Sequence, residues 1–399
     1  MLININDASV LLKVSLSTLR RWDSDGKLKS IRVQNSHRKY DSKDIVYILK
    51  NNMDTQVKLK KFKFIDLFAG VWWFHHAFSN LWGECVSAVE FDKNCRITYE
   101  LNYYNNNKEL FDKWLFFEDI REVDEKRIPN HDILCGGFPC QAFSIAWYQK
   151  WFSDERGNLF FDIERIIKEK NPSVIFLENV KNLASHDGWR TFGVILQRLK
   201  EQGYFIRYKV LNSYEYGDVP QNRERVYIVG FKDWKAYERF EFPKPQKLTK
   251  KMRDILEDDV DLSFYYNDKP LFGKLVWEMK NWDTAYQWRR QYVRENKKNL
   301  IPTLTANMGT GGHNVPLILD TKGIRKLTPR ECFSAQGYPE SFKLPKIANS
   351  QLYKQAGNSV SVPVLQRIGE NILFALGLVW EKHRHFELVS DATEIPLMA

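Results

Sequence analysis

Short apolar runs alternate with helix-like stretches between residues 62 and 232. Six of these runs have the β-branched and aromatic composition of buried strands: FKFIDLFAG, ECVSAVEFD, HDILCGGF, PSVIFLENV, YFIRYKVLNS and ERVYIVGF. Between them, NLFFDIERIIKEK and WRTFGVILQRLKEQGY repeat apolar residues at helical spacing. This alternation predicts an α/β fold with a doubly wound, mostly parallel sheet. Such a sheet binds ligands at the carboxyl ends of its strands.

The N-terminal residues 1–52 follow a different pattern. ASVLLKVSLSTLRRWDSDGKL predicts two short helices, and the basic stretch IRVQNSHRKYDSKDI predicts a pair of strands. Helix, turn, helix and a basic wing resemble the winged helix-turn-helix of the MerR and excisionase type. The resemblance implies that Arg20, Arg21 and Arg38 meet DNA phosphates or base edges. The alternative is a three-helix adaptor with a solvated basic face.

Changes of pattern divide the rest of the chain. A polar stretch, KNNMDTQVKLKK, predicts a linker, and the strand–helix rhythm stops at about residue 233. An irregular, charged and aromatic region follows, which we interpret as an inserted domain before the chain rejoins the first one. The predicted boundaries are 1–52, 53–61, 62–232, 233–315, 316–380 and a tail at 381–399.

Composition narrows the classes of function. The net charge of +10 favours a polyanionic partner such as nucleic acid, although many basic proteins have none. No apolar run reaches the length of a membrane span, and the N-terminus lacks the pattern of a signal peptide. The five cysteines contain no C-x-x-C pair and the eight histidines no metal spacing, so we expect no metal. These features predict a cytoplasmic protein without membrane contact.

Candidate chemistry follows several predicted strands. FIDLFAG ends in a small-residue turn that suits a nucleotide-like ligand, and Glu90 ends the next strand as a candidate ribose acceptor. Asp119 could accept from an exocyclic amine or form a surface ion pair. Cys140 follows a proline after another strand and is either a nucleophile or a structural thiol.

Two further strands carry charged residues. Glu178 follows the apolar run IFL, where burial would raise the pKa of its carboxyl group and let it hold a proton. Arg223 and Arg225 are two residues apart, which in a strand puts both guanidinium groups on one face. Such a pair can orient a carboxylate or bind a phosphate.

These motifs occur in a specific order: DLFAG, Pro-Cys-Gln, Glu-Asn-Val and Gln-x-Arg-x-Arg, then RKLTPREC, QGYP and AGNSV. In this order they resemble the cytosine-5 DNA methyltransferases of restriction-modification systems, over about residues 62–232 and 316–375. The resemblance implies a Rossmann-like domain that binds S-adenosylmethionine, with residues 233–315 as an inserted target-recognition domain.

The family resemblance assigns roles at the target base. Cys140 matches the nucleophile that adds to C6 of cytosine, and Glu178 matches the acid that contacts N3 and the exocyclic amine. Arg223 and Arg225 match the arginines beside the base, with Arg225 the one that contacts it. The base must be flipped out of the duplex for this chemistry.

The resemblance also implies the residues that hold the donor and the DNA. Phe68 would stack on adenine and Glu90 would bind the ribose. The donor site would be completed by Gly70, Asp119, Ile120, Pro139, Leu159, Asn358 and Val360. The DNA contacts would include Gln141, Ser144, Gly311 and Gly312, with a monomer expected on double-stranded target DNA.

Tryptophan stands where the family pattern has glycine. Trp72 and Trp73 replace the Gly-Gly that follows DLFAG, and Trp147 and Trp151 lie in the loop after the nucleophile. Two indoles beside the donor would crowd its methionine part, because glycine serves where backbone approaches a ligand. The indoles could point outwards with activity kept, the protein could be catalytically impaired, or the letters could be substitutions or sequence errors.

The two resemblances therefore imply a bacterial, nucleoid-associated DNA (cytosine-5) methyltransferase that protects DNA from a cognate restriction endonuclease and regulates its own operon. The alternative is an impaired relative that acts as a DNA-binding transcriptional regulator. A tRNA methyltransferase on the same scaffold is a further alternative, which the long inserted region makes less suitable.

Overall fold

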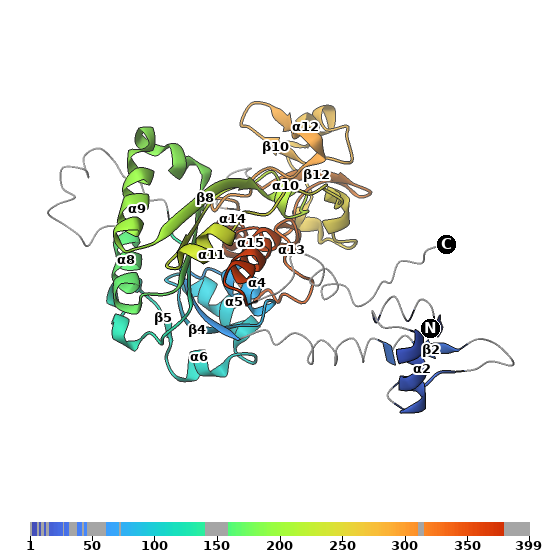
Figure 1. Cartoon of the computed structure of the whole chain (residues 1–399). Helices are drawn as coiled ribbons and strands as arrows, with labels where there is room; N and C mark the ends of the chain where they lie inside the picture. Colours follow the sequence, from blue (N-terminus) through green and yellow to red (C-terminus); the bar gives the residue numbers. More distant parts are fainter. Residues whose placement is uncertain are drawn as a thin grey trace. The chain divides into compact units, whose positions relative to one another are not determined.

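The computed structural model describes residues 2–5, 8, 12, 16–26, 28–31, 38–41, 44–45, 61–71, 73–139, 159–309 and 315–378. The chain separates into two compact units, Met1–Lys60 and Lys61–Ala399 (Figure 1). Each unit has its own hydrophobic core, so each is described by itself.

The N-terminal unit contains a helix and a small antiparallel sheet. Strands β1 (Leu2–Asn4) and β2 (Lys39–Asp41) pair with Ile3 opposite Tyr40, and helix α2 spans Leu16–Ser24. Leu19 and Trp22 of α2 are buried, whereas Arg20 and Arg21 between them are exposed. The inward-facing residues form a small core: Ala8, Leu12, Leu19, Trp22, Leu28, Tyr40 and Ile45.

A seven-stranded sheet organises the larger unit. The spatial order of its strands is β5-β4-β3-β6-β7-β9-β8, in which β9 points opposite to the other six strands and all pairs without β9 are parallel. The predicted doubly wound, mostly parallel sheet is confirmed. Its strands are β3 (Phe62–Leu67), β4 (Gly83–Val89), β5 (Phe116–Phe117), β6 (Ile133–Gly137), β7 (Val174–Val180), β8 (Phe205–Asn212) and β9 (Glu224–Phe231).

Both faces of this sheet are covered, because successive strand side chains point to opposite sides. Phe64 and Phe176 join a core with the helices of one face, while Ile65 and Ile175 join a core with α8 and α9 on the other. Figure 1 shows α8 and α9 stacked along the same side of the sheet. The helices are α4 (Trp73–Ser79), α5 (Lys93–Tyr103), α6 (Lys108–Asp112), α8 (Leu159–Lys170), α9 (Arg190–Glu201), α10 (Ser213–Tyr216), α11 (Trp234–Arg239) and α15 (Val362–Ala375).

The inserted region has a sheet of its own. Four antiparallel strands in the order β11-β10-β12-β13 pack with helix α12 (Phe272–Glu278). The strands are β10 (Tyr286–Trp288), β11 (Val293–Glu295), β12 (Leu317–Asp320) and β13 (Gly323–Lys326). This sheet continues past residue 315, where the sequence pattern placed the end of the insertion. Strand pairing across that point makes β12 and β13 part of the same layer as β10.

The C-terminal segment returns to the large sheet. Helix α13 (Pro329–Ser334) begins with a capping box, in which Thr328 Oγ1 accepts from the N–H of Glu331 at 3.1 Å and the Glu331 carboxylate accepts from the N–H of Thr328 at 2.8 Å. Helix α14 (Asn349–Asn358) ends in the AGNSV motif, and α15 then packs on α4. Gly357 is required by a close approach, because a Cβ there would collide with the backbone of Thr305.

Candidate active site

The turn after β3 and the end of β4 form one side of the candidate site. Phe68 and Gly70 both have left-handed backbone conformations, with φ of +58° and +57°. Glu90 Oε2 accepts a hydrogen bond from the N–H of Gly70 at 2.7 Å, and Oε1 accepts one from the N–H of Asp92 at 2.7 Å. Burial raises the pKa of the Glu90 carboxyl group, while these two N–H donors oppose the rise. The predicted ribose acceptor thus lies against the predicted donor turn.

Asp119 and Ile120 extend this edge of the sheet. They follow β5, which pairs with the last residues of β4. The Asp119 carboxylate accepts from the N–H of Arg121 at 3.0 Å and forms an ion pair with its guanidinium group, which lowers the pKa of Asp119. Ile120 is buried. The Asp119 carboxylate is thus paired with Arg121 of the same loop. This is the surface ion pair that the sequence offered as an alternative to a contact with an exocyclic amine.

The indole of Trp73 lies between two glycines of the site. Trp73 Cε2 lies 2.6 Å from the point where a Cβ on Gly70 would stand, and its Cζ3 lies 2.8 Å from the same point on Gly137. The side chain is 6% exposed, and its Nε1 has no hydrogen-bond partner among the described residues. An aromatic side chain therefore fills the space between the β3 turn and the end of β6.

The other side of the site is built from β7 and β9. Arg225 Nε lies 3.0 Å from Glu178 Oε1, and both side chains are almost fully buried. Burial raises the pKa of Glu178, while the positive charges of Arg225 and Arg223 oppose the rise. A Cβ on Gly137 would stand 3.4 Å from Glu178 Oε2, so this carboxylate borders the same space as the Trp73 indole.

Arg223 is directed elsewhere than the sequence predicted. Its Nη1 donates to the carbonyl of Leu304 at 2.9 Å, and its Nη2 donates to the carbonyls of Gly357, at 3.1 Å, and Ser359. The side chain is 1% exposed. Arg223 thus holds together the end of the insertion and the AGNSV segment, and these carbonyls, rather than a base, take its donors in this structure.

Sequence reasoning did not single out Asn179 of the Glu-Asn-Val motif. Its Nδ2 donates to the carbonyl of Phe138 at 2.8 Å, and its Oδ1 accepts from the N–H of Val180 at 2.8 Å. Phe138 precedes Pro139 and Cys140, so Asn179 fixes the chain that leads to the predicted nucleophile. The only signal available was the polar residue next to Glu178 in an otherwise apolar strand.

The remaining predicted positions fall into two groups. Pro139 is exposed after β6, Leu159 is half-buried at the start of α8, Asn358 is exposed at the end of α14, and Val360 is buried. Outside the described residues lie Cys140, Gln141, Ser144, Gly311, Gly312, Trp72, Trp147 and Trp151.

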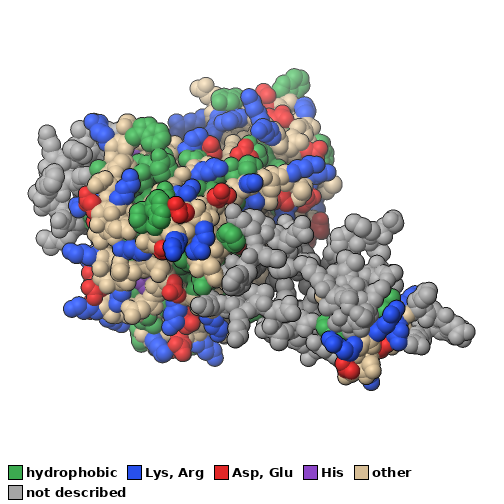
Figure 2. Space-filling model, viewed as in Figure 1, with side chains coloured by type: hydrophobic (Ala, Val, Ile, Leu, Met, Phe, Trp, Pro, Cys, Tyr) green, Lys and Arg blue, Asp and Glu red, His purple; other side chains and the backbone are tan. Residues whose placement is uncertain are grey.

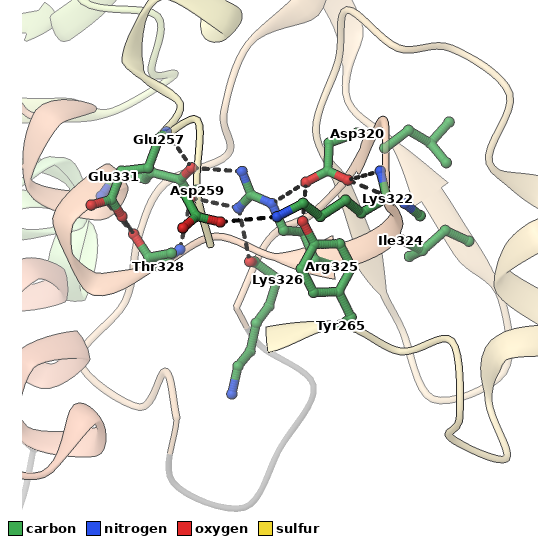
Figure 3. A network of polar contacts seen from close by, with 12 residues as sticks. Glu257, Asp259, Tyr265, Asp320, Lys322, Ile324, Arg325, Lys326, Thr328 and Glu331 are labelled. Atoms are coloured by element: carbon green, nitrogen blue, oxygen red, sulfur yellow. Dashed lines mark hydrogen bonds and ion pairs between the residues drawn. The ribbon is translucent and has the colours of Figure 1, made fainter. Parts of the chain in front are cut away.

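A buried network joins the insertion to the C-terminal return (Figure 3). Arg325 of β13 donates to both oxygens of Glu331 at 2.7 and 2.8 Å, and its Nε donates to Asp320 at 2.5 Å. Glu331 also accepts the N–H of Glu257 at 2.9 Å. Because Arg325 and Glu331 are buried, their charges need these partners. The network thereby connects β13 of the four-stranded sheet to α13.

In the N-terminal unit the predicted basic residues differ in their surroundings. Arg20 and Arg21 are exposed on α2, whereas Arg38 Nε forms an ion pair with Asp23 at 2.8 Å. Asp23 also accepts from the N–H and hydroxyl of Ser30. Arg38 therefore connects the strand region to α2.

The order of the motifs agrees with the comparisons to known proteins. The profile of the family described as C-5 cytosine-specific DNA methylase matches residues 62–373. The chain belongs to this family. The methylase is 53% identical over 313 residues to the Type II methyltransferase M.Bsp6I of a Bacillus strain, covering 77% of this chain and 97% of the relative. It is 40% identical to M.HhaI of Haemophilus parahaemolyticus, covering 79% and 95%.

The fold comparison and the N-terminal comparison agree with these matches. The crystal structure of a Spodoptera frugiperda DNMT2 mutant superposes with a TM-score of 0.61 at 21% identity, covering 78% of the methylase and 99% of that chain. Residues 3–50 match the profile of the MerR HTH family of regulatory proteins. The predicted family, fold and helix-turn-helix are thereby confirmed.

Methylases of this family use S-adenosylmethionine. Part of the site suits this donor: Glu90 lies beside a turn with left-handed backbone, and one oxygen of the buried Asp66 has no partner among the described residues. Trp73 does not suit it, since its indole occupies the space next to Gly70. In the described ranges, no group of three or more side chains could hold a metal ion, and no helix combines the length and apolar character that a bilayer span requires.

Proposed function

We propose that this methylase transfers a methyl group to C5 of a cytosine flipped out of a specific duplex site. The observation that supports this most directly is the buried Glu178–Arg225 pair at the carboxyl end of β7, beside the strand that leads to Cys140. A buried carboxyl group with a raised pKa can hold a proton toward N3 of cytosine. Arg225 orients that carboxyl group and can donate to the base.

Cys140 would attack C6 as a thiolate, which turns C5 into a nucleophile. After C5 takes the methyl group, loss of the C5 proton and departure of the Cys140 thiolate from C6 would restore the aromatic ring. S-adenosylmethionine supplies an electrophilic methyl group on a sulfonium. Glu90 would hold its ribose and Phe68 its adenine, with Gly70, Asp119, Ile120, Pro139, Leu159, Asn358 and Val360 completing that site. Asn179 positions the chain before Cys140, and Arg223 acts as a positioning residue that connects the insertion to the AGNSV segment.

The insertion would read the DNA sequence through the β10–β11 ribbon. A two-stranded ribbon fits the major groove, and arginine binds guanine through O6 and N7. Arg289, Arg290 and Gln291 are exposed at the tip of the ribbon, and Arg294 is exposed on β11. Figure 2 shows lysine and arginine side chains at the end of the larger unit where Figure 1 labels α12 and β10. Gln141, Ser144, Gly311 and Gly312 would contact the nucleotide and the DNA backbone.

The N-terminal unit would bind operator DNA of its own operon through Arg20 and Arg21. The match to MerR regulators and the exposure of both arginines on α2 support this role. Arg38 would act through its ion pair with Asp23, which holds the strand region on α2. A gel shift with residues 1–60 and promoter DNA tests the role, and absence of retardation at low salt would reject it.

Resemblance to restriction-system methyltransferases supports protection of DNA from a cognate endonuclease. The measurement is bisulfite sequencing of DNA from cells that express the methylase, compared with cells that express Cys140→Ser. One methylated sequence motif is expected with the first and none with the second. Trp73 supports a second candidate, a regulator with little turnover, which would give no motif in either culture but the same promoter retardation.

A further inference from the structure

Three tryptophans of the larger unit have a backbone conformation that favours glycine. Trp82, Trp114 and Trp189 have φ of +67°, +56° and +74°. In this region the Cβ of an L residue lies too close to a carbonyl oxygen, which costs roughly tenfold in the conformational equilibrium. Glycine has no Cβ and adopts the conformation freely.

Trp114 lies in a hydrogen-bonded turn in which glycine is usual. Helix α6 ends at Asp112, and the N–H of Leu115 then donates to the carbonyl of Leu110 at 3.0 Å. The N–H of Trp114 donates to the carbonyl of Phe111 at 3.1 Å. These two hydrogen bonds define the Schellman motif, whose left-handed position is most often glycine. Trp114 occupies that position.

Trp82 and Trp189 also mark element boundaries. Trp82 follows α4 and donates its N–H to the carbonyl of Ser79 at 3.1 Å. Trp189 immediately precedes α9 and follows Gly188, which has φ of +61°. The side chains offer no visible compensation for the backbone cost: Trp82, Trp114 and Trp189 are 56%, 79% and 57% exposed, and no described ring or cation stacks on them.

Trp73 presents a different conflict at the candidate site. Its indole is buried against Gly70 and Gly137, yet its Nε1 lacks a partner among the described residues. A buried indole N–H normally finds an acceptor. Here the side chain fills space beside a backbone turn, and its only polar atom has no partner among the described residues.

Other tryptophans lack these features. Trp22 belongs to the N-terminal core, and Trp234 packs on Phe205 with ring centroids 4.9 Å apart. Trp277 and Trp282 each lie under a cation, and neither has a positive φ. The described tryptophans thus fall into two classes, one in ordinary surroundings and one in surroundings suited to glycine.

We propose that Trp73, Trp82, Trp114 and Trp189 stand at glycine positions of this fold, and that the chain made in its own cell carries glycine at all four. Glycine and tryptophan codons can differ in a single base. If these four positions share a codon that the source cell decodes as glycine, different from the codon used at positions 234 and 277, glycine would stand at all four and tryptophan would remain at the other two. Glycine at position 73 removes the indole between Gly70 and Gly137, which opens the space next to Glu178.

The conformational part of the proposal is tested by a matched pair of variants. Trp114 and Trp277 are 79% and 78% exposed, but only Trp114 has a positive φ, while Trp277 lies within α12. Trp114→Gly should lower the unfolding equilibrium constant about three- to tenfold, and Trp277→Gly should raise it about twofold. An unchanged or raised constant for Trp114→Gly overturns the argument, and this test does not depend on methylation.

The decisive experiment is peptide sequencing by mass spectrometry of the protein purified from cells that carry the gene naturally. Glycine is expected at positions 73, 82, 114 and 189, and tryptophan at positions 234 and 277, which serve as internal controls. Tryptophan at all six positions overturns the proposal.

Discussion

Arg225 Nε lies 3.0 Å from Glu178 Oε1, across two neighbouring antiparallel strands of the large sheet. The side chains are 12% and 7% exposed, so both charges have lost most of their water. A buried ion pair gains little stability over apolar residues of the same size. Its position at the end of β7, rather than any gain in stability, is what the proposed chemistry uses.

The first prediction concerns this carboxyl group. Glu178→Gln keeps the shape of the side chain but cannot exchange a proton with the base. We expect kcat for methylation to fall about 100-fold or more, as for loss of a general acid. Glu224, on β9 next to Arg225, is more exposed and pairs with Lys181, so Glu224→Gln is the control. Equal rates for the two variants would remove Glu178 from the mechanism.

The second prediction concerns the buried imidazole of His75. Its Nδ1 lies 2.6 Å from the Tyr99 hydroxyl, and burial lowers its pKa from 6.5 to about 3. Between these two pKa values the unfolded chain therefore binds more protons than the folded one. The contribution of the neutral imidazole to the free energy of unfolding is complete above pH 6.5 and is lost as the pH falls toward 3. In this pH range His75→Gln should reduce the slope of unfolding free energy against pH by up to about 1.4 kcal/mol per pH unit. Parallel pH curves from denaturant unfolding would contradict the assignment.

Much of this arrangement followed from the sequence pattern. The runs around Ile65 and Ile175 predicted strands, because both faces of a parallel sheet are buried and its strands are apolar throughout. The order of motifs predicted that Glu90 and Glu178 lie at strand ends. The long-range hydrogen bonds could not be predicted: Arg223 binds carbonyls 81 to 136 residues away, and no local pattern encodes such partners.

The C-terminal end of the insertion could not be predicted from the sequence either. Strands β12 and β13 are short, and they resemble the start of the C-terminal return when read alone. Only their pairing with β10 places them in the four-stranded sheet. The strained backbone conformation of Trp114 could not be predicted from the sequence either, since it depends on the turn that follows α6.

The third prediction concerns the buried network in which Arg325 of β13 binds Glu331 of α13. Glu331→Ala leaves the buried Arg325 without its bidentate partner and should cost about 3–5 kcal/mol of unfolding free energy. Lys322→Ala removes a solvent-exposed ion pair with Asp259 and should cost at most about 1 kcal/mol. Chemical denaturation of both variants provides the comparison. A Glu331→Ala loss as small as that of Lys322→Ala would refute the network's role.

The fourth prediction concerns base reading by the β10–β11 ribbon. Replacing Arg289 and Arg290 by glutamine removes two candidate guanine contacts, each worth about 1–3 kcal/mol of discrimination. We expect methylation of the target duplex to fall more than tenfold at fixed salt. Arg239→Gln, an exposed arginine on α11, is the control for loss of charge alone. An equal loss with the control would attribute the effect to general electrostatics.

The fifth prediction concerns the donor. Trp72→Gly with Trp73→Gly should raise the affinity for S-adenosylmethionine about tenfold or more, since a gain of about 1.4 kcal/mol corresponds to a factor of ten. Isothermal titration calorimetry measures it, with Trp277→Gly as the control for a tryptophan lost elsewhere. Equal affinities of the unaltered chain and the double variant would refute crowding by Trp73.

The central claim is that the thiolate of Cys140 bonds to C6 of a flipped cytosine. The direct measurement uses duplex DNA with 5-fluorocytosine in the target motif, together with S-adenosylmethionine, because fluorine at C5 blocks release of the enzyme. We predict a covalent complex that survives denaturing electrophoresis with the Trp72→Gly, Trp73→Gly variant, and none when Cys140→Ser is added to it. Absence of a complex in the first case, or its persistence in the second, would contradict the account.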